Sequence, residues 1–173
     1  MSYFLHYISI GLFYFSMFYP KYKQDNPSND FLHSIFFLYL LSVLSLTVLP
    51  LPERIFFQKV DLFTMINLFP FRDVYYGYLF AKREILLNII MMVPFGFLLP
   101  LLTRFKAVKT IILSFFFSFT IESTQLLASL LSPDYYRIVD ITDLITNTVG
   151  GAIGYCLFSA WKHFFPSSRQ PKS

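Results

Sequence analysis

Acidic, amide and hydroxyl side chains recur at helical spacing inside apolar stretches of the sequence. One such set is separated by four, three and four residues: Ser118, Glu122, Gln125 and Ser129. This spacing places the set on one face of a helix. Further along the chain, Asp143 and Asn147 begin a second stripe of the same kind. Ionisable groups within a membrane are costly and usually face the interior of a bundle or a wet cavity. Such groups could share a proton, hold a hard cation through oxygen atoms, or bind a polar ligand.

Small residues and a proline accompany these polar groups. The second stripe continues with Gly150 and Gly154, and Gly151 stands beside them. A GxxxG pattern lets a neighbouring helix approach closely. In an earlier apolar run, Asn88 lies near the start, and Pro94 and Gly96 follow near the middle. We expect Pro94 to kink that helix and to free a backbone carbonyl that needs a partner.

The composition indicates the class of protein that must position these groups. Of the 173 residues, 55% are hydrophobic, 21% are aromatic and 14% are charged, whereas a typical soluble domain has about 25% charged residues. This balance excludes intrinsic disorder, a collagen-like chain and a disulfide-stapled scaffold, and Cys156 has no second cysteine to pair with. The basic residues stand between apolar runs rather than in one stripe, which argues against nucleic-acid binding. The sequence predicts a polytopic membrane protein.

Runs with few or no charges give the expected organisation. They cover residues 1–20, 31–52, 85–103, 110–133 and 144–161. Each meets or approaches the ~20 residues that a helix needs to cross a membrane. We therefore predict an all-α bundle of about five transmembrane helices that forms a single membrane unit over residues 1–173, with a polar tail at 166–173. The connection at 53–84 is too apolar for free exposure to water. It should lie in the interface or re-enter the bundle, either as a linker or as a lid.

The basic residues also suggest an orientation. Arg104, Lys106 and Lys109 fill one short connection, which the positive-inside rule places in the cytoplasm. The N-terminus is then outside and the C-terminus is cytoplasmic. Because successive spans alternate in direction, the polar groups of the last three spans converge on one side of the membrane, here the outer side. This convergence holds for either orientation, and it favours a site over scattered packing contacts.

Several ordered motifs resemble one family. They are Asn67-Leu68-Phe69-Pro70-Phe71, the Asn88 to Pro94-Phe95-Gly96 run, Glu122-x-x-Gln125, and Arg137 to Gly151 with its Asp140, Asp143, Asn147 and Gly150 positions. The chain resembles the VanZ-like family of small membrane proteins over residues 67–154. The resemblance implies a part in glycopeptide resistance, because the family is named for an accessory protein that lowers susceptibility to teicoplanin. It does not imply a molecular mechanism.

These patterns predict two sets of site residues. The candidate pocket residues are Asn67, Asn88, Glu122, Gln125, Arg137, Asp140, Asp143 and Asn147, and the candidate packing residues are Pro94, Gly96, Gly150, Gly151 and Gly154. Within the pocket, Arg137 could pair with an acid or bind a carboxylate or phosphate of a ligand. The alternative interpretation is a buried arginine, acid and amide network that only fixes the register of the helices.

Two classes of function remain open. The first is a non-catalytic envelope protein whose outward-facing pocket binds a lipid or glycopeptide-related ligand. The second is a membrane enzyme that uses Glu122 or Asp143 as a general base on a lipid-linked or cell-wall precursor. The sequence has no nucleophile elbow, P-loop or zinc motif, which favours the first class. We predict the bilayer as a partner, no nucleic acid, and no cofactor or metal, although the acids could hold a hard divalent cation. Nothing in the sequence predicts the oligomeric state.

Overall fold

The computed structural model describes residues 27–48, 62–131 and 137–165. This part of the chain is mostly helical, as predicted. Its elements in chain order are α2 (Pro27–Val48), α3 (Leu62–Met65), β1 (Ile66–Asn67), α4 (Arg72–Tyr75), α5 (Ala81–Thr103), α6 (Ala107–Leu131), β2 (Val139–Asp140) and α7 (Ile141–Phe164). The four long helices coincide with four of the predicted apolar runs. The remaining run, residues 1–20, and the predicted tail at 166–173 lie outside the described residues.

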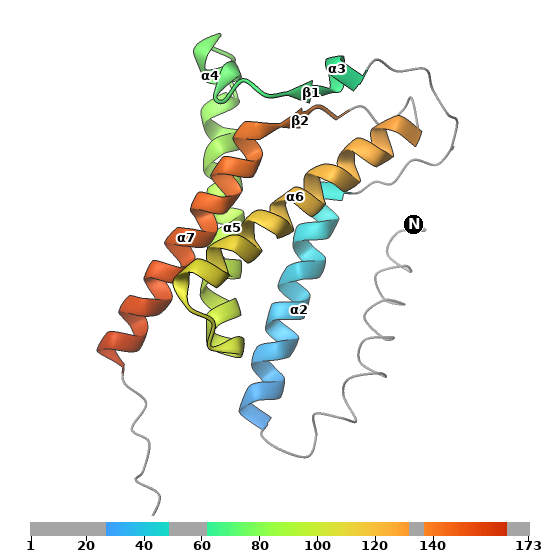
Figure 1. The fold of residues 1–173 in the computed structure, drawn as a ribbon. Coiled ribbons are helices and arrows are strands. Elements are labelled where there is room, and N and C mark those ends of the chain that lie inside the picture. The colour runs from blue at the N-terminus through green and yellow to red at the C-terminus, as the bar shows by residue number, and fades with distance from the viewer. Residues whose placement is uncertain (1–26, 49–61, 132–136, 166–173) are drawn as a thin grey trace, which may run out of the picture.

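The long helices alternate in direction (Figure 1). Helices α5 and α7 lie side by side and run the same way, while α2 and α6 run the opposite way, with α6 crossing the others obliquely. The starts of α5 and α7 and the ends of α2 and α6 therefore point to the same side. The short elements α3, β1, α4 and β2 gather on that side, which we call the connector end.

Two short strands join the connections at this end. Strands β1 and β2 are parallel, with Ile66 opposite Val139 and Asn67 opposite Asp140. Farther along, the backbone N–H of Phe71 donates to Thr142 Oγ1 at 2.9 Å. The prediction of an all-α chain missed this pair, because two residues are too few to show the alternation that marks a strand. The described part of the 53–84 connection is thus folded onto the start of α7. Its proposed position in the membrane interface stays a prediction.

Glycines bring α5 and α7 into direct backbone contact. A Cβ atom on Gly96 would collide with the main chain of Gly151, and one on Gly154 would collide with the carbonyl of Val93. A Cβ on Gly150 would likewise meet the carbonyl of Ile89. No side chain larger than hydrogen fits at these positions without moving a helix. The two helices can therefore pack along their length only with glycine there.

Helix α2 packs against α5 beside Pro94, one of the two prolines inside α5. α5 continues through Pro94 as one helix, although proline removes a backbone donor and crowds the preceding turn. In that turn, the carbonyl of Met91 accepts a hydrogen bond of 2.8 Å from the Tyr39 hydroxyl. Phe36 of α2 also contacts Phe95, with ring centroids 5.8 Å apart. A backbone carbonyl in the turn before Pro94 thus gains a hydrogen-bond donor from the neighbouring helix α2.

Apolar outer faces make the bundle compatible with a lipid environment. Within the described residues, α5 and α6 are long and apolar enough to cross a membrane, and α2 contributes the shorter apolar stretch Phe31–Thr47. In α7 the polar residues Thr146 and Asn147 are buried, whereas large apolar side chains lie exposed on its outer face: Val149, Ile153 and Leu157. These polar side chains of α7 therefore face the interior of the bundle, while the apolar side chains face outward. The five-span arrangement stays a prediction.

Candidate functional site

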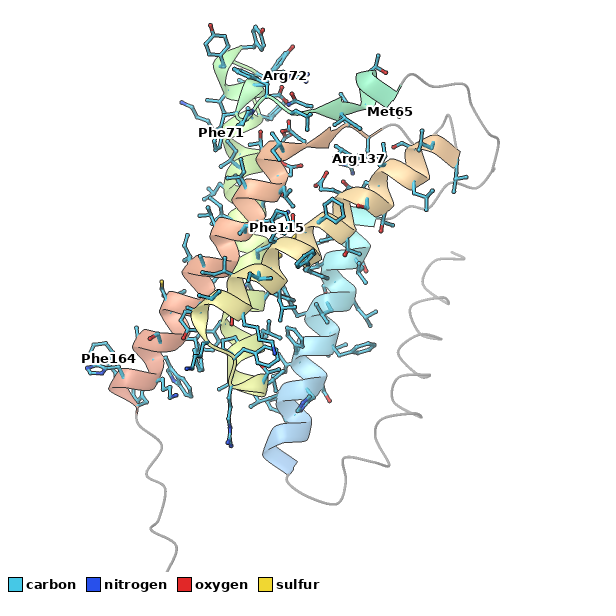
Figure 2. The ribbon with its side chains drawn as sticks, in the orientation of Figure 1. Met65, Phe71, Arg72, Phe115, Arg137 and Phe164 are labelled. Atoms are coloured by element: carbon cyan, nitrogen blue, oxygen red, sulfur yellow. The ribbon has the colours of Figure 1, made fainter. Side chains whose placement is uncertain are left out.

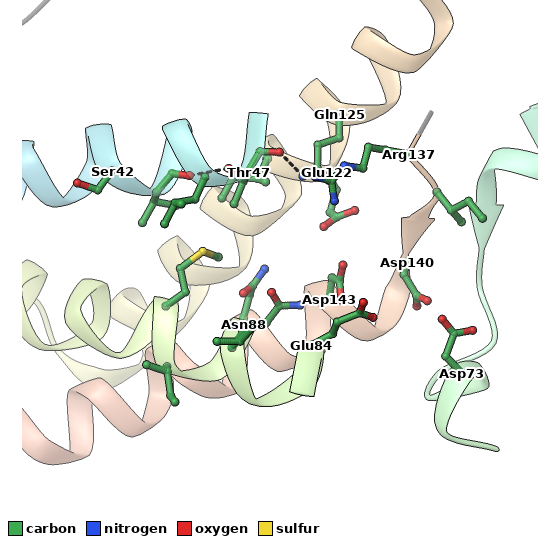
Figure 3. A pocket seen from close by; sticks show the side chains of 18 of the residues that line it. Ser42, Thr47, Asp73, Glu84, Asn88, Glu122, Gln125, Arg137, Asp140 and Asp143 are labelled. Carbon is green, nitrogen blue, oxygen red and sulfur yellow. Dashed lines mark hydrogen bonds between the residues drawn. The ribbon is translucent and has the colours of Figure 1, made fainter. Parts of the chain in front are cut away.

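A pocket of about 750 Å³ lies between the four long helices and the connector end. Helix α2 forms one side with Tyr39, Val43, Leu46 and Thr47, and α5 faces it with Leu87, Asn88 and Met91. Charged side chains cluster in the part of the pocket nearest the connector end (Figure 3). They comprise five carboxylates and two arginines: Asp73, Glu84, Glu122, Asp140, Asp143, Arg72 and Arg137. Both arginines lie at the connector end of the bundle (Figure 2).

The structure places seven of the eight candidate pocket residues in this wall. They are Asn88, Glu122, Gln125, Arg137, Asp140, Asp143 and Asn147. Asn67 does not line the pocket, but its Nδ2 donates a 2.7 Å hydrogen bond to Asp140 Oδ2. Residues that are widely separated in sequence are brought together because the helices alternate in direction.

Glu122 is the most enclosed acid of the pocket wall. It is only 5% exposed, and its Oε2 atom has no hydrogen-bond partner among the described residues. Figure 3 shows the carboxyl group turned toward Asn88 and Asp143 across the pocket. Buried polar atoms in folded proteins nearly always have a partner, so the unpaired oxygen of this pocket-lining acid indicates a role beyond packing.

Three amides tie the helices together around the pocket. Asn88 Nδ2 of α5 donates to Asp143 Oδ1 of α7 at 2.7 Å. Asn147 Nδ2 of α7 donates to Ser118 Oγ of α6 at 2.9 Å. Gln125 Nε2 of α6 donates to the carbonyl of Thr47 near the end of α2 at 2.6 Å. Each bond joins a different pair of helices, so these amide nitrogens fix the register of the helices, as the alternative interpretation expects.

Both carboxylate oxygens of Asp140 make hydrogen bonds that stabilise the fold. Its Oδ1 accepts from the backbone N–H of Thr142 at 2.7 Å and caps the start of α7, while its Oδ2 accepts from Asn67. Aspartate is a favoured residue at this capping position because its carboxylate satisfies an otherwise unpaired helix N–H. Asp140 therefore lines the pocket with both oxygen atoms already engaged.

Arg137 does not lie in the expected buried network. It is exposed, and its side chain makes no ion pair within 4.0 Å in the part of the chain that the structure describes. The ion pair found there is the Arg72–Asp73 bridge of 3.2 Å. Only the backbone of Arg137 is fixed, by a 2.9 Å bond from its N–H to Ser129 Oγ. The interpretation that Arg137 belongs to a buried register lock is wrong. Its guanidinium group is directed toward Glu122 and Gln125 instead (Figure 3).

Three charged pocket residues were not predicted: Arg72, Asp73 and Glu84. The sequence could have indicated Glu84 as a pocket residue, because Glu84 precedes Asn88 by four residues and so lies on the same face of the helix. No such signal marks the other two, whose position depends on how the connector folds onto α7. No group of three His, Cys, Asp or Glu residues within the described ranges could hold a metal ion.

Comparison with known families decides the relationship. A family model described as VanZ/LLP1 matches residues 36–162. The chain belongs to the VanZ/LLP1 family. This match confirms the predicted resemblance, and it extends from α2 to the last turn of α7, so it includes every residue of the pocket wall. No curated protein and no solved structure matches the chain.

Membership of the VanZ/LLP1 family and the two apolar helices make this a membrane protein. The family also links it in general terms to antibiotic resistance.

Proposed function

We propose that this VanZ/LLP1 protein is a multi-pass membrane protein that contributes to glycopeptide resistance of the teicoplanin type, or to cell-envelope homeostasis, by binding a ligand in its outward-facing pocket. One observation carries the proposal. Glu122, a buried carboxylate, and Arg137, an exposed cation, line the same pocket. Among the described residues, Glu122 Oε2 has no hydrogen-bond partner and Arg137 makes no ion pair, so both groups are available to a ligand.

The size and lining of the pocket support binding of a small amphipathic molecule. Its volume of about 750 Å³ falls within the roughly 300–1,000 Å³ of typical small-molecule sites. The charged groups lie near the connector end, while Tyr39, Val43 and Met91 line the part between α2 and α5. A lipid or a glycopeptide-related envelope molecule with a polar head and an apolar body suits this arrangement.

Susceptibility testing examines the proposed function directly. Expression of the wild-type protein in a susceptible Gram-positive host should raise the minimum inhibitory concentration of teicoplanin more than that of vancomycin, as the family relationship implies. The control is the same host with an empty vector. If the two strains are equally susceptible to teicoplanin, the resistance function is wrong for this member, and only the envelope role survives.

A second candidate function is an enzyme that acts on a lipid-linked or cell-wall precursor. The observation that favours it is again Glu122 Oε2, which has no partner in the part of the chain that the structure describes, since a general base must reach the proton that it abstracts. Asp143, held by Asn88 across the same pocket, is the second candidate base. Incubation of the purified protein with lipid-linked precursors separates the two functions. Product formation that disappears in Glu122→Gln would favour the enzyme.

The proposed orientation makes a further prediction. In a Cys156→Ser background, a cysteine at Tyr78 should react with a membrane-impermeant thiol reagent in intact cells, and a cysteine at Lys106 should not. Tyr78 is 62% exposed at the connector end, while Lys106 is exposed between α5 and α6 at the other end. The reverse labelling pattern would place the pocket on the cytoplasmic side and overturn the outward-facing arrangement.

A further inference from the structure

Two buried oxygen atoms in the pocket wall have no donor among the described residues: Glu122 Oε2 and Asn147 Oδ1. Glu122 is 5% exposed and Asn147 is 2% exposed. They come from different helices, α6 and α7. The amide nitrogen of Asn147 is already used, because it donates to Ser118, which leaves its oxygen to accept. Unpaired buried acceptors are costly, so a ligand that supplies N–H or O–H donors would satisfy both.

The charges of the pocket indicate the sign of that ligand. Five carboxylates and two arginines line it, which gives a formal excess of three negative charges. Arg72 is engaged by Asp73 at 3.2 Å, and this leaves Arg137 as the one unpaired cation of the described pocket wall. A cationic donor is therefore favoured. A primary ammonium group has three N–H donors and no acceptor, which matches a wall that offers acceptors and negative charge.

The apolar part of the pocket indicates what carries the ammonium group. Along α5 the lining runs from Glu84 in the first turn to Pro94, a distance of about 15 Å at the rise of an α-helix. Leu87, Ile90 and Met91 lie between these two residues in the lining. On α2, Val43 and Leu46 face the same space. A pocket of this length and volume has room for an apolar chain as well as for a cation.

We propose that the pocket binds a primary ammonium group carried on an apolar chain, with Glu122 Oε2 and Asn147 Oδ1 as its acceptors. This inference rests on the proposed function only in taking the same pocket as the ligand site. The ammonium could belong to the headgroup of an amine-bearing lipid or to an amphipathic small molecule. In either case the recognition is the same, because the acceptors contact the nitrogen.

Binding to the purified full-length protein in detergent tests the inference. The probes are decylamine, decyltrimethylammonium and decanol, which share a chain, and ethylamine, which lacks one. Binding is measured by calorimetry and by the thermal unfolding midpoint. A hydrogen bond to a charged group contributes enough that its loss weakens binding by about tenfold to a hundredfold. Decylamine should therefore bind that much more tightly than decyltrimethylammonium, which has no N–H donor, and ethylamine should bind more weakly than decylamine. Equal binding of the two decyl cations would overturn the inference.

A matched pair of variants locates the acceptor. Glu122→Gln keeps the shape of the side chain but removes the charge, so it should lose the preference for decylamine. Asp30→Asn makes the same chemical change in the first turn of α2, far along that helix from its pocket-lining residues, and should keep the preference. An unchanged preference in Glu122→Gln would overturn the assignment even if the wild type binds amines.

Short-chain phosphatidylethanolamine distinguishes the two sources. Tighter binding of this lipid than of decylamine supports a lipid headgroup, and binding of decylamine alone supports an amphipathic amine. The result is independent of antibiotic susceptibility. If the protein binds the amine but does not protect against teicoplanin, the proposed function is wrong and this inference stands. If the protein protects but shows no preference for the amine, this inference is wrong and the proposed function stands.

Discussion

Glu122→Gln should abolish protection against teicoplanin while the protein still folds and accumulates in the membrane. Glutamine has nearly the same shape as glutamate, so the packing of α6 is retained. The change removes the negative charge and replaces an oxygen that has no partner in the described structure with an amide donor. If the protein protects by binding a ligand in the pocket, loss of this acceptor and its charge should prevent ligand binding and therefore abolish protection.

The measurement is the minimum inhibitory concentration of teicoplanin at equal protein abundance, with abundance read from membrane immunoblots. Ser123→Ala is the matched control, since Ser123 is the next residue on α6, is exposed and does not line the pocket. Equal protection by Glu122→Gln and the wild type would show that the carboxylate serves only the structure.

Arg137→Ala complements this result. Because Arg137 is exposed and in no ion pair among the described residues, its loss should change the free energy of unfolding by less than about 1 kcal/mol. Loss of protection in this stable variant would therefore reflect ligand binding rather than folding. Retention of protection would confine the ligand contacts to the acids and amides.

The long helices were predictable from the sequence because an apolar run of about 20 residues with few or no charges is a strong signal. Their alternation in direction then placed Asn88, Glu122 and Asp143 at one end without any knowledge of packing. Glu84 was within reach of the same argument, since it stands one helical turn before Asn88. These parts of the site depend only on helix periodicity and chain direction.

The connector was not predictable, because its arrangement depends on contacts between distant segments. Asn67 reaches Asp140 only through the parallel pairing of β1 and β2. The same folding of the connector onto α7 brings Arg72 and Asp73 into the pocket wall. A pair of two-residue strands leaves no periodic pattern in either segment.

The sequence also could not separate structural amides from ligand-binding ones. Asn88 and Gln125 donate to partners on neighbouring helices, which explains their presence without a ligand. Asn147 has both features, since its nitrogen binds Ser118 while its oxygen has no partner in the described structure. Only the atomic positions show which atom of such an amide is already hydrogen-bonded within the protein.

Gly154→Leu should prevent stable packing of α5 against α7. Even a Cβ at this position would collide with the backbone carbonyl of Val93, and a backbone atom cannot rotate away as a side chain can. Overpacking a core usually costs about 1–3 kcal/mol and occasionally more. With a main-chain obstacle we expect a loss of about 3 kcal/mol or more in the free energy of unfolding. Separation of the helices should also weaken the Asn88–Asp143 bond at the pocket.

Thermal unfolding of the detergent-solubilised protein provides the measurement, with membrane abundance as a second readout. Ala160→Leu is the control, because Ala160 lies on the same helix but is exposed; the added volume should change the unfolding midpoint little. Gly154→Leu with the stability of the control would mean that α7 does not approach α5 at its backbone. In that case the pocket wall that α5 and α7 form together would have a different shape, and the assignment of Asn147 as an acceptor would fail with it.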